Sequence, residues 1–245
     1  MLRRDGEAVR VGPWRGAADT ALLAPAPGVV GPVSPPFLRW CARLLSGRGF
    51  SRVVSAALLP TDTASYREAG FTTFEQLHLL SRDLSDLPPM PATPAVMRRA
   101  RRRDLGAVVA LDHAAFQPFW RFDADGIVEA RTITPRARFR VSEVGGQPAG
   151  YAVTGLGEQQ GYLQRLAVSP DLQRRHIGSA LVIDALEWLA RRRAVRVMVN
   201  TQLSNEPAVA VYLSLGFRLE PVRLEVLALD LGARTDLDES SPSEP

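Results

Sequence analysis

The sequence of 245 residues contains no lysine, a single cysteine and three histidines. The lone Cys41 excludes an internal disulfide and a cysteine-based zinc site, so we expect no metal, and it favours a reducing compartment. All 30 cationic residues are arginines, whose planar, permanently charged fork binds phosphates and carboxylates. The net charge of +4 fits a phosphate-bearing ligand and is too small to require nucleic acid.

An uninterrupted apolar run long enough to span a membrane is also missing. Residues 20–38 are free of charge, but they hold five prolines and two glycines, which break a spanning helix where lipid supplies no water to unpaired carbonyls. Arg3 and Arg4 are not followed by an apolar run, so we expect no signal peptide. The sequence therefore predicts a cytoplasmic protein without a membrane partner.

Composition divides the chain into four parts. Hydrophobic residues at 46% and charged residues at 23% are typical of a globular protein. Residues 86–94 contain four prolines, which favour a stiff, extended linker. Residues 232–245 are poor in apolar residues and predict a disordered acidic tail. The expected organisation is a lobe at 1–85, the linker, a second domain at 95–231 and the tail.

The second domain shows alternating helix and strand patterns. Five arginines between positions 98 and 103 fit either a solvated strand and turn or a nucleic-acid patch; we favour the first, leading into a helix at 105–116 capped by Asp104. Two more helices are predicted at 177–193 and 206–215, the latter ending at Gly216. Strands are predicted at 139–144, 149–154, 161–168, 195–199 and 224–231.

The first lobe repeats the end of this pattern. Residues 64–71 share four of eight residues with residues 210–217, including a tyrosine and a terminal Gly-Phe pair. A helix at 37–45 and strands at 52–59 and 75–80 complete the same order of helix, strand, helix and strand. We interpret the lobe as a degenerate half-repeat.

The turn between residues 168 and 180 has the features of an anion site. A strand ends there and a helix begins, so unpaired amide N–H groups and the positive end of the helix dipole converge. Gly178 and Ser179 allow a phosphate close to the backbone, and Arg174 and Arg175 add positive charge. The alternative is a surface helix start with incidental arginines.

A second element, Asn205 to Phe217, reads as a capped amphipathic helix on which Ala208 and Tyr212 share a face. Together the two elements resemble the GCN5-related N-acetyltransferase (GNAT) superfamily, over roughly residues 95–231. The resemblance implies an α/β (α+β) fold with a mixed, mostly antiparallel sheet flanked by helices, and acetyl-CoA as cosubstrate. It implies that Tyr212 protonates the leaving thiolate, and it assigns these cofactor-binding residues: Leu166, Ala167, Val168, Gln173, Arg174, Arg175, His176, Ile177, Gly178, Ser179 and Asn205.

The sequence departs from the family pattern in two places. His176 stands where the first glycine of the phosphate loop is usual, although a shifted match through Arg175 and Gly178 is also open. We expect residue 176 to take the helical φ that any L-residue can adopt, so that binding survives. Relatives that acetylate protein N-termini often carry a glutamate where this chain has Asn200. Glu158, Glu143, Asp123 or a held water remain open as the general base.

Four aromatic residues lie between Phe116 and Phe122. Such a cluster is either core or, as in the ribosomal-protein N-terminal acetyltransferases it resembles, a wall for the acceptor amine. We take Phe116, Phe119 and Trp120 as substrate-binding candidates.

The sequence thus predicts an acyltransferase that moves the acetyl group of acetyl-CoA directly to a primary amine of a peptide, protein or small molecule, since neither motif has a cysteine for an acyl-enzyme. A non-catalytic acetyl-CoA-binding regulator is the alternative, and a nucleic-acid-binding protein using residues 98–103 is a third. The first lobe is expected to lack a CoA site and to bury apolar surface against the second domain, extending its sheet or imitating a dimer partner, while the oligomeric state stays open.

Overall fold

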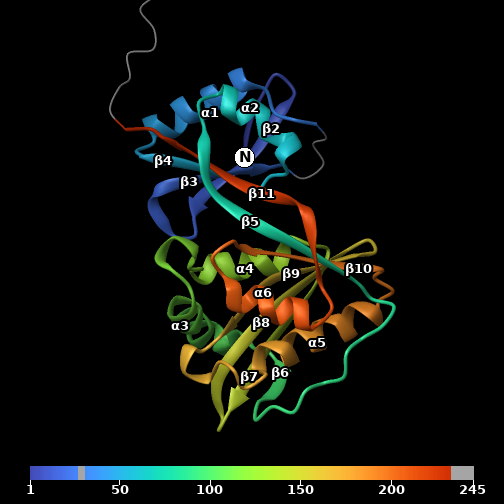
Figure 1. Ribbon diagram of the computed structural model, residues 1–245. Coiled ribbons are helices and arrows are strands. Elements are labelled where there is room, and N and C mark those ends of the chain that lie inside the picture. The colour runs from blue at the N-terminus through green and yellow to red at the C-terminus, as the bar shows by residue number, and fades with distance from the viewer. Residues whose placement is uncertain (27–30, 233–245) are drawn as a thin grey trace, which may run out of the picture. The chain divides into compact units, whose positions relative to one another are not determined.

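The computed structural model describes residues 1–26 and 31–232 (Figure 1). The predicted tail at 232–245 therefore lies, apart from its first residue, outside the described residues. The chain divides into two compact units, the first made of Met1–Gln76 with Leu224–Pro245 and the second of Leu77–Arg223. Within the described ranges, no helix is both long and apolar enough to cross a bilayer.

The first unit is a sheet with two helices. Strands β1, β2 and β3 pair antiparallel in succession, and β3 pairs parallel with β4. β4 in turn pairs antiparallel with the end of β11 (Arg218–Asp230). Its core joins α1 to these strands through residues such as Leu23, Leu38 and Val53. Its elements are β1 (Leu2–Arg4), β2 (Glu7–Trp14), β3 (Ala17–Pro25), α1 (Pro35–Gly47), β4 (Arg52–Ser55), a 3₁₀ turn η1 (Pro60–Asp62), α2 (Ala64–Glu68) and the start of β5 (Thr72–Asp83).

The first three strands are absent from the sequence-based prediction. The turns that join them are Asp5-Gly6 and Arg15-Gly16, and both residues of each pair have positive φ. Such pairs form the tight turns whose twist matches antiparallel strands, so Asp5-Gly6 was a usable signal. The sequence-based prediction missed these strands because buried and exposed residues do not alternate regularly in β2, and because β2 contains Gly12 and Pro13.

The second unit has strand order β5-β10-β9-β8-β7-β6. The pairs are antiparallel except for β9 with β10, which is parallel. The predicted helices and strands are present, most of the strands longer than expected, while α4 was not predicted. The elements are β6 (Val96–Arg99), η2 (Arg102–Asp104), α3 (Leu105–Ala115), η3 (Pro118–Trp120), α4 (Ala124–Thr132), β7 (Arg136–Val144), β8 (Gln147–Gly157), β9 (Gln160–Val168), η4 (Pro170–Leu172), α5 (Ile177–Ala190), β10 (Arg196–Gln202), α6 (Glu206–Ser214) and β11 (Arg218–Asp230).

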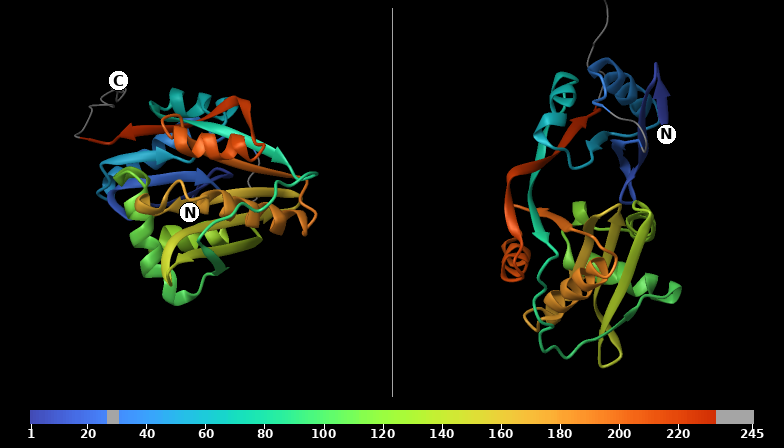
Figure 2. Two further views of the ribbon diagram at one scale, coloured as in Figure 1. Left: turned by 60° about the horizontal axis from the view of Figure 1, so that its bottom comes forward. Right: turned by 90° about the vertical axis from the view of Figure 1, so that its right-hand side faces the viewer.

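Helices cover both faces of the second unit's sheet. The apolar side of α5 packs on one face, with Leu186 and Leu189 fully buried against Val197 and Leu163. Helices α3 and α4 pack on the other face around Tyr151. Figure 2 shows α5 (orange) and the green α3 on opposite sides of the yellow strands. This is the mixed, mostly antiparallel sheet flanked by helices that the resemblance implied.

The two units repeat one motif in atomic detail. In α2 the amide of Phe71 donates to the carbonyl of Tyr66 at 3.0 Å, and in α6 the amide of Phe217 donates to that of Tyr212 at 3.0 Å. Gly70 and Gly216, the residues between, have φ of +97° and +80°. This left-handed position explains the shared glycines, because other residues rarely adopt it. The half-repeat inferred from eight residues thus has a matching local structure.

Two expectations about helix starts were wrong. His176, the residue before α5, has φ 57° and ψ 12°, which is left-handed and not the right-handed helical conformation we expected. The family's usual glycine at this position fits that geometry without strain, and His176 adopts it nonetheless. Asp104 does not cap α3 through its side chain; the carboxylate accepts instead from the amide of Arg101 at 2.6 Å.

We predict that Gly161→Ala lowers the free energy of unfolding by about 1–3 kcal/mol, the usual cost of overpacking a core. A Cβ at Gly161 would lie 2.5 Å from Cδ1 of Leu189, and Leu189 is fully buried. Gly157→Ala is the control, because nothing lies within 4 Å of its added Cβ. Chemical denaturation measures both; equal stability of the two variants would contradict the close packing of α5 on β9.

We further predict that His176→Gly raises the free energy of unfolding by up to about 1 kcal/mol, since a left-handed L-residue costs about 1–2 kcal/mol and the added freedom of glycine in the unfolded chain offsets part of it. Arg175→Gly is the control: φ of Arg175 is not positive, so it should lose about 0.4–1 kcal/mol. Thermal and urea unfolding test the pair. A His176→Gly variant less stable than wild type would show that His176 makes compensating contacts.

Candidate active site

The parallel pairing of β9 with β10 is short. It joins Gln160 to Arg196, Gly161 to Val197 and Tyr162 to Met198, and among the described residues it ends there. β10 stays paired with β5 through Gln202, and β9 stays paired with β8 through Val168. The two strands therefore separate toward their carboxyl ends, leaving backbone groups of Leu166–Val168 open on the β10 side.

A bulge in β9 decides which side chains point to which face. Val153 of β8 lies opposite Arg165 and Thr154 lies opposite Leu163, so Gln164 is an extra residue. Before the bulge Leu163 packs with α5, whereas after it Ala167 packs with α3 and α4. Leu166 and Val168 pack with the start of α5. The bulge thereby turns Arg165 toward α3.

The start of α5 is open to a ligand. Its first internal hydrogen bond runs from the amide of Ala180 to the carbonyl of His176 at 2.9 Å, and the His176 side chain does not cap the helix. The amides of Ile177, Gly178 and Ser179 therefore keep their donors free for an anion. Residues Gln173–His176 are exposed, and a Cβ at Gly178 would lie 3.6 Å from Cγ2 of Val168. The structure thus brings the predicted phosphate turn to the end of β9.

Three other helices close their starts with side chains. Ser34 caps α1, Asp123 caps α4, and Asn205 caps α6 by accepting from the amide of Ala208 at 3.3 Å. Nδ2 of the Asn205 side chain also donates to Oγ1 of Thr201 at the end of β10, at 3.0 Å. Asn205 is therefore held rigidly between β10 and α6.

Tyr212 lies on α6 with 4% of its surface exposed. Burial raises the pKa of its hydroxyl far above the usual value, and the positive charge of Arg165 opposes that shift. The phenol therefore stays protonated at any working pH, as a proton donor requires. Its ring packs against Phe217 at 5.4 Å between centroids. Tyr212 and Leu166 belong to the same core, which places the helix beside β9.

Two of the predicted acceptor residues, Phe116 and Trp120, contact an arginine that the sequence did not single out. The guanidinium carbon of Arg165 lies 3.5 Å from the ring centre of Phe116, and its Nη2 donates to the carbonyl of Trp120 at 2.6 Å. Trp120 is buried, and Phe119 meets its ring edge-on at 5.2 Å. The sequence-based prediction did not identify Arg165 or its partner Asp112 as site residues. A usable signal was present, because each is a charged residue within the mainly apolar pattern of a predicted strand or helix.

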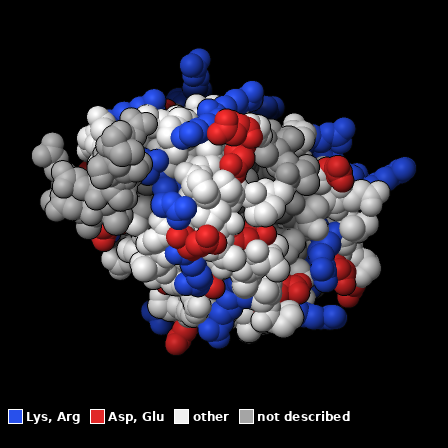
Figure 3. Space-filling view, turned by 90° about the horizontal axis from the view of Figure 1, so that it is seen from above, with Lys and Arg blue, Asp and Glu red and all other residues white. Residues whose placement is uncertain are grey.

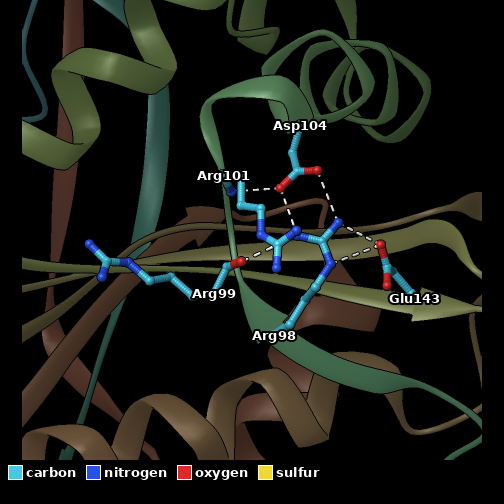
Figure 4. A network of polar contacts seen from close by, with 5 residues as sticks. All are labelled: Arg98, Arg99, Arg101, Asp104 and Glu143. Carbon is cyan, nitrogen blue, oxygen red and sulfur yellow. Dashed lines mark hydrogen bonds and ion pairs between the residues drawn. The ribbon is translucent and has the colours of Figure 1, made fainter.

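Two of the open candidates for the general base are engaged elsewhere. Glu143 pairs with Arg98 (2.5 Å to Nη2), which lowers the pKa of Glu143 (Figure 4). Asp123 accepts from the amide of Gly126 at 2.7 Å as the cap of α4. Glu158 lies exposed in a turn with φ 50°. To act as the general base, Glu143 would have to break its ion pair with Arg98, and Asp123 would have to break its cap of α4.

The arginine run at 98–103 forms β6 and η2, as expected for a strand and turn. Arg98 donates to both oxygens of Asp104, at 2.7 and 2.9 Å, and this pairing lowers the pKa of Asp104 to about 2 (Figure 4). Arg98 is therefore not available to a phosphate backbone. On the face shown in Figure 3, arginines are interspersed with acidic side chains, which is not the single-sign patch typical of nucleic-acid binding.

Comparison with known proteins agrees with this geometry. Residues 96–217 match the model of the acetyltransferase (GNAT) family. A mycothiol acetyltransferase of Acidothermus cellulolyticus is 34% identical over 185 residues, covering 65% of this chain and 56% of that protein. The ribosomal protein bS18-alanine N-acetyltransferase of Escherichia coli K12 is 33% identical over 78 residues, covering 32% of this chain and 53% of that protein. The chain thus spans a little over half the length of these two relatives.

Solved structures share the fold. A GCN5-related N-acetyltransferase from Sphaerobacter thermophilus superposes with a TM-score of 0.61 at 15% identity, covering 91% of this chain and 76% of that one. A tandem GNAT protein from the clavulanic acid biosynthesis pathway gives 0.64 at 17% identity, covering 89% and 77%. Separated parallel strands, an uncapped helix start beside them and the match over residues 96–217 confirm the resemblance: the chain belongs to the GCN5-related N-acetyltransferase family.

Proposed function

We propose that the second unit is an acetyl-CoA-dependent N-acetyltransferase that transfers the acetyl group directly to a primary amine. The observation that carries this proposal is the open start of α5 beside the separated ends of β9 and β10. A family member with these two features has a place for the cosubstrate's phosphates and one for its arm.

The residues available fit acetyl-CoA. The free amides of Ile177, Gly178 and Ser179 suit a pyrophosphate, and Arg174 and Arg175 lie exposed just before them. The unpaired edge of β9 at Leu166–Val168 offers backbone groups to the amides of a pantetheine arm. Gln173, His176 and Asn205 complete the set of proposed contacts.

The chemistry needs little from the protein beyond placement. Bound acetyl-CoA would supply an activated thioester to an attacking amine. A backbone amide of β9 near Val168 can donate to the carbonyl oxygen as negative charge develops there. As the new carbon–nitrogen bond forms and the carbon–sulfur bond breaks, Tyr212, protonated in its buried site, can give its proton to the departing sulfur. The proton that the attacking nitrogen loses passes to water. Neither motif has a cysteine, which supports direct transfer without an acyl-enzyme.

The proposed acceptor is a primary amine, and the names of two relatives suggest which amines to test first. One relative is named for mycothiol and another for the alanine of ribosomal protein bS18. A screen of small-molecule amines and of peptides with N-terminal alanine, read by release of free CoA thiol, tests the proposal. Acetyl-CoA binding without turnover on any amine would support the regulator in its place.

We propose that the first unit holds no second site. Its equivalent helix, α1, is closed: Ser34 caps it, and the Glu7 carboxylate accepts from the amide of Ser34 at 2.5 Å and from its hydroxyl at 2.7 Å. A carboxylate of the chain itself thus occupies the region where a phosphate would bind. It also repels a second anion there.

Tyr212→Phe should leave acetyl-CoA affinity nearly unchanged and lower turnover by about 10²- to 10⁴-fold, the usual contribution of a general acid. Tyr162→Phe is the control, because Tyr162 is an exposed tyrosine of β9. Steady-state kinetics with an acceptor found in the screen, together with calorimetry of acetyl-CoA binding, measures both effects. Wild-type turnover in Tyr212→Phe would remove Tyr212 from the mechanism.

Calorimetric titration with acetyl-CoA should saturate at about one equivalent per chain, because α5 is open and α1 is closed. Gly178→Glu should abolish this binding through bulk and charge. Gly178→Ala should retain it, since the added methyl makes only ordinary contact with Val168. A second equivalent of similar affinity that survives Gly178→Glu would place a site in the first unit.

A further inference from the structure

The carboxylate of Asp112 is the most completely satisfied buried charge beside the proposed site. None of its surface is exposed. Oδ1 accepts from the amide of Phe122 at 2.6 Å and from Nη2 of Arg165 at 2.9 Å. Oδ2 accepts from Nε of Arg165 at 2.7 Å and from the hydroxyl of Tyr151 at 2.5 Å. Four donors from three parts of the chain therefore meet at one residue of α3.

The guanidinium of Arg165 is held by two aromatic rings and by hydrogen bonds from Nε and Nη2. Its plane lies between the rings of Phe116 and Phe122, whose centres are 3.5 and 4.0 Å from the guanidinium carbon. Its edge meets Asp112 through two nitrogens and the carbonyl of Trp120 through one of them. This arrangement uses the planar fork and the stacking capacity that lysine lacks.

These contacts tie the segment Phe116–Phe122 to β9 at both of its ends and near its middle. The same segment holds all the aromatic candidates for binding the acceptor. Arg165 lies three residues before Val168, and its charge acts on Tyr212. One side chain thus links the candidate acceptor segment, strand β9 and the proposed acid Tyr212.

We propose that Arg165, held by Asp112, is a positioning residue that sets the acceptor-binding segment 116–122 against β9. The proposal rests on the proposed acetyltransferase function. It also changes the interpretation of the aromatic cluster: the faces of Phe116 and Phe122 that could bind a cationic amine already bind the chain's own guanidinium. One face of each of these two rings is therefore closed to the acceptor amine.

The test uses Arg165→Met and the milder Arg165→Lys in the full-length protein. Arg138→Met is the matched control, because Arg138 makes the same two-nitrogen pair with Asp184, at 2.9 and 2.8 Å, from β7. Hydrogen exchange in peptides covering residues 116–122 should become at least about tenfold faster in both Arg165 variants and stay unchanged in Arg138→Met. If Arg165→Met does not fold, Arg165→Lys, which keeps the charge and most of the stem, carries the test.

Kinetics supplies the second readout. The KM for the acceptor amine should rise by about 10- to 100-fold in the Arg165 variants, while acetyl-CoA affinity stays within about twofold of wild type. Unchanged exchange at 116–122, or equal changes in Arg138→Met, would overturn the proposal. Exchange needs no turnover, so a wild-type protein that fails to bind acetyl-CoA would refute the proposed function and leave this result interpretable.

Discussion

The early end of the β9–β10 ladder is the constraint on which the rest of the second unit depends. Two parallel strands that pair over only three positions must be held apart by other partners, here β8 on one side and β5 on the other. Their separation leaves backbone donors and acceptors unpaired on β9, which a buried strand tolerates only where a ligand or water can reach them. The start of α5 and the cap of α6 lie at the same end.

A second constraint comes from the two buried charges, Asp112 and Arg165, that lie near the separated part of β9. Asp112 is tolerable inside the unit because four donors surround it, and Arg165 because its fork and both faces are occupied. The bulge at Gln164 makes this possible, since it turns Arg165 toward α3 while Leu166 and Val168 still face α5. One inserted residue thus lets consecutive side chains of β9 pack against α3 on one face and α5 on the other.

The two units share local structure but differ in how their first long helix begins. Both have parallel central strands followed and preceded by helices, and both end α2 or α6 with the same tyrosine, glycine and phenylalanine contacts. The difference lies in the helix start. The first amides of α5 are free, whereas α1 begins with two prolines that have no N–H, its Phe37 amide donates to Oγ of Ser34, and the amide of Ser34 donates to Glu7.

The sequence by itself determined the family and the order of strands and helices from β7 to α6, because these depend on contiguous patterns such as the residues around Gly178 and Asn205. It did not determine the β1–β3 meander, the left-handed His176 or the helix α4. Only the tertiary structure decided that the end of β11 pairs with β4, that Glu143 pairs with Arg98, and that Asp112 pairs with Arg165. Those contacts join residues far apart in the chain, and no local pattern carries information about which distant charge will neutralise a buried one.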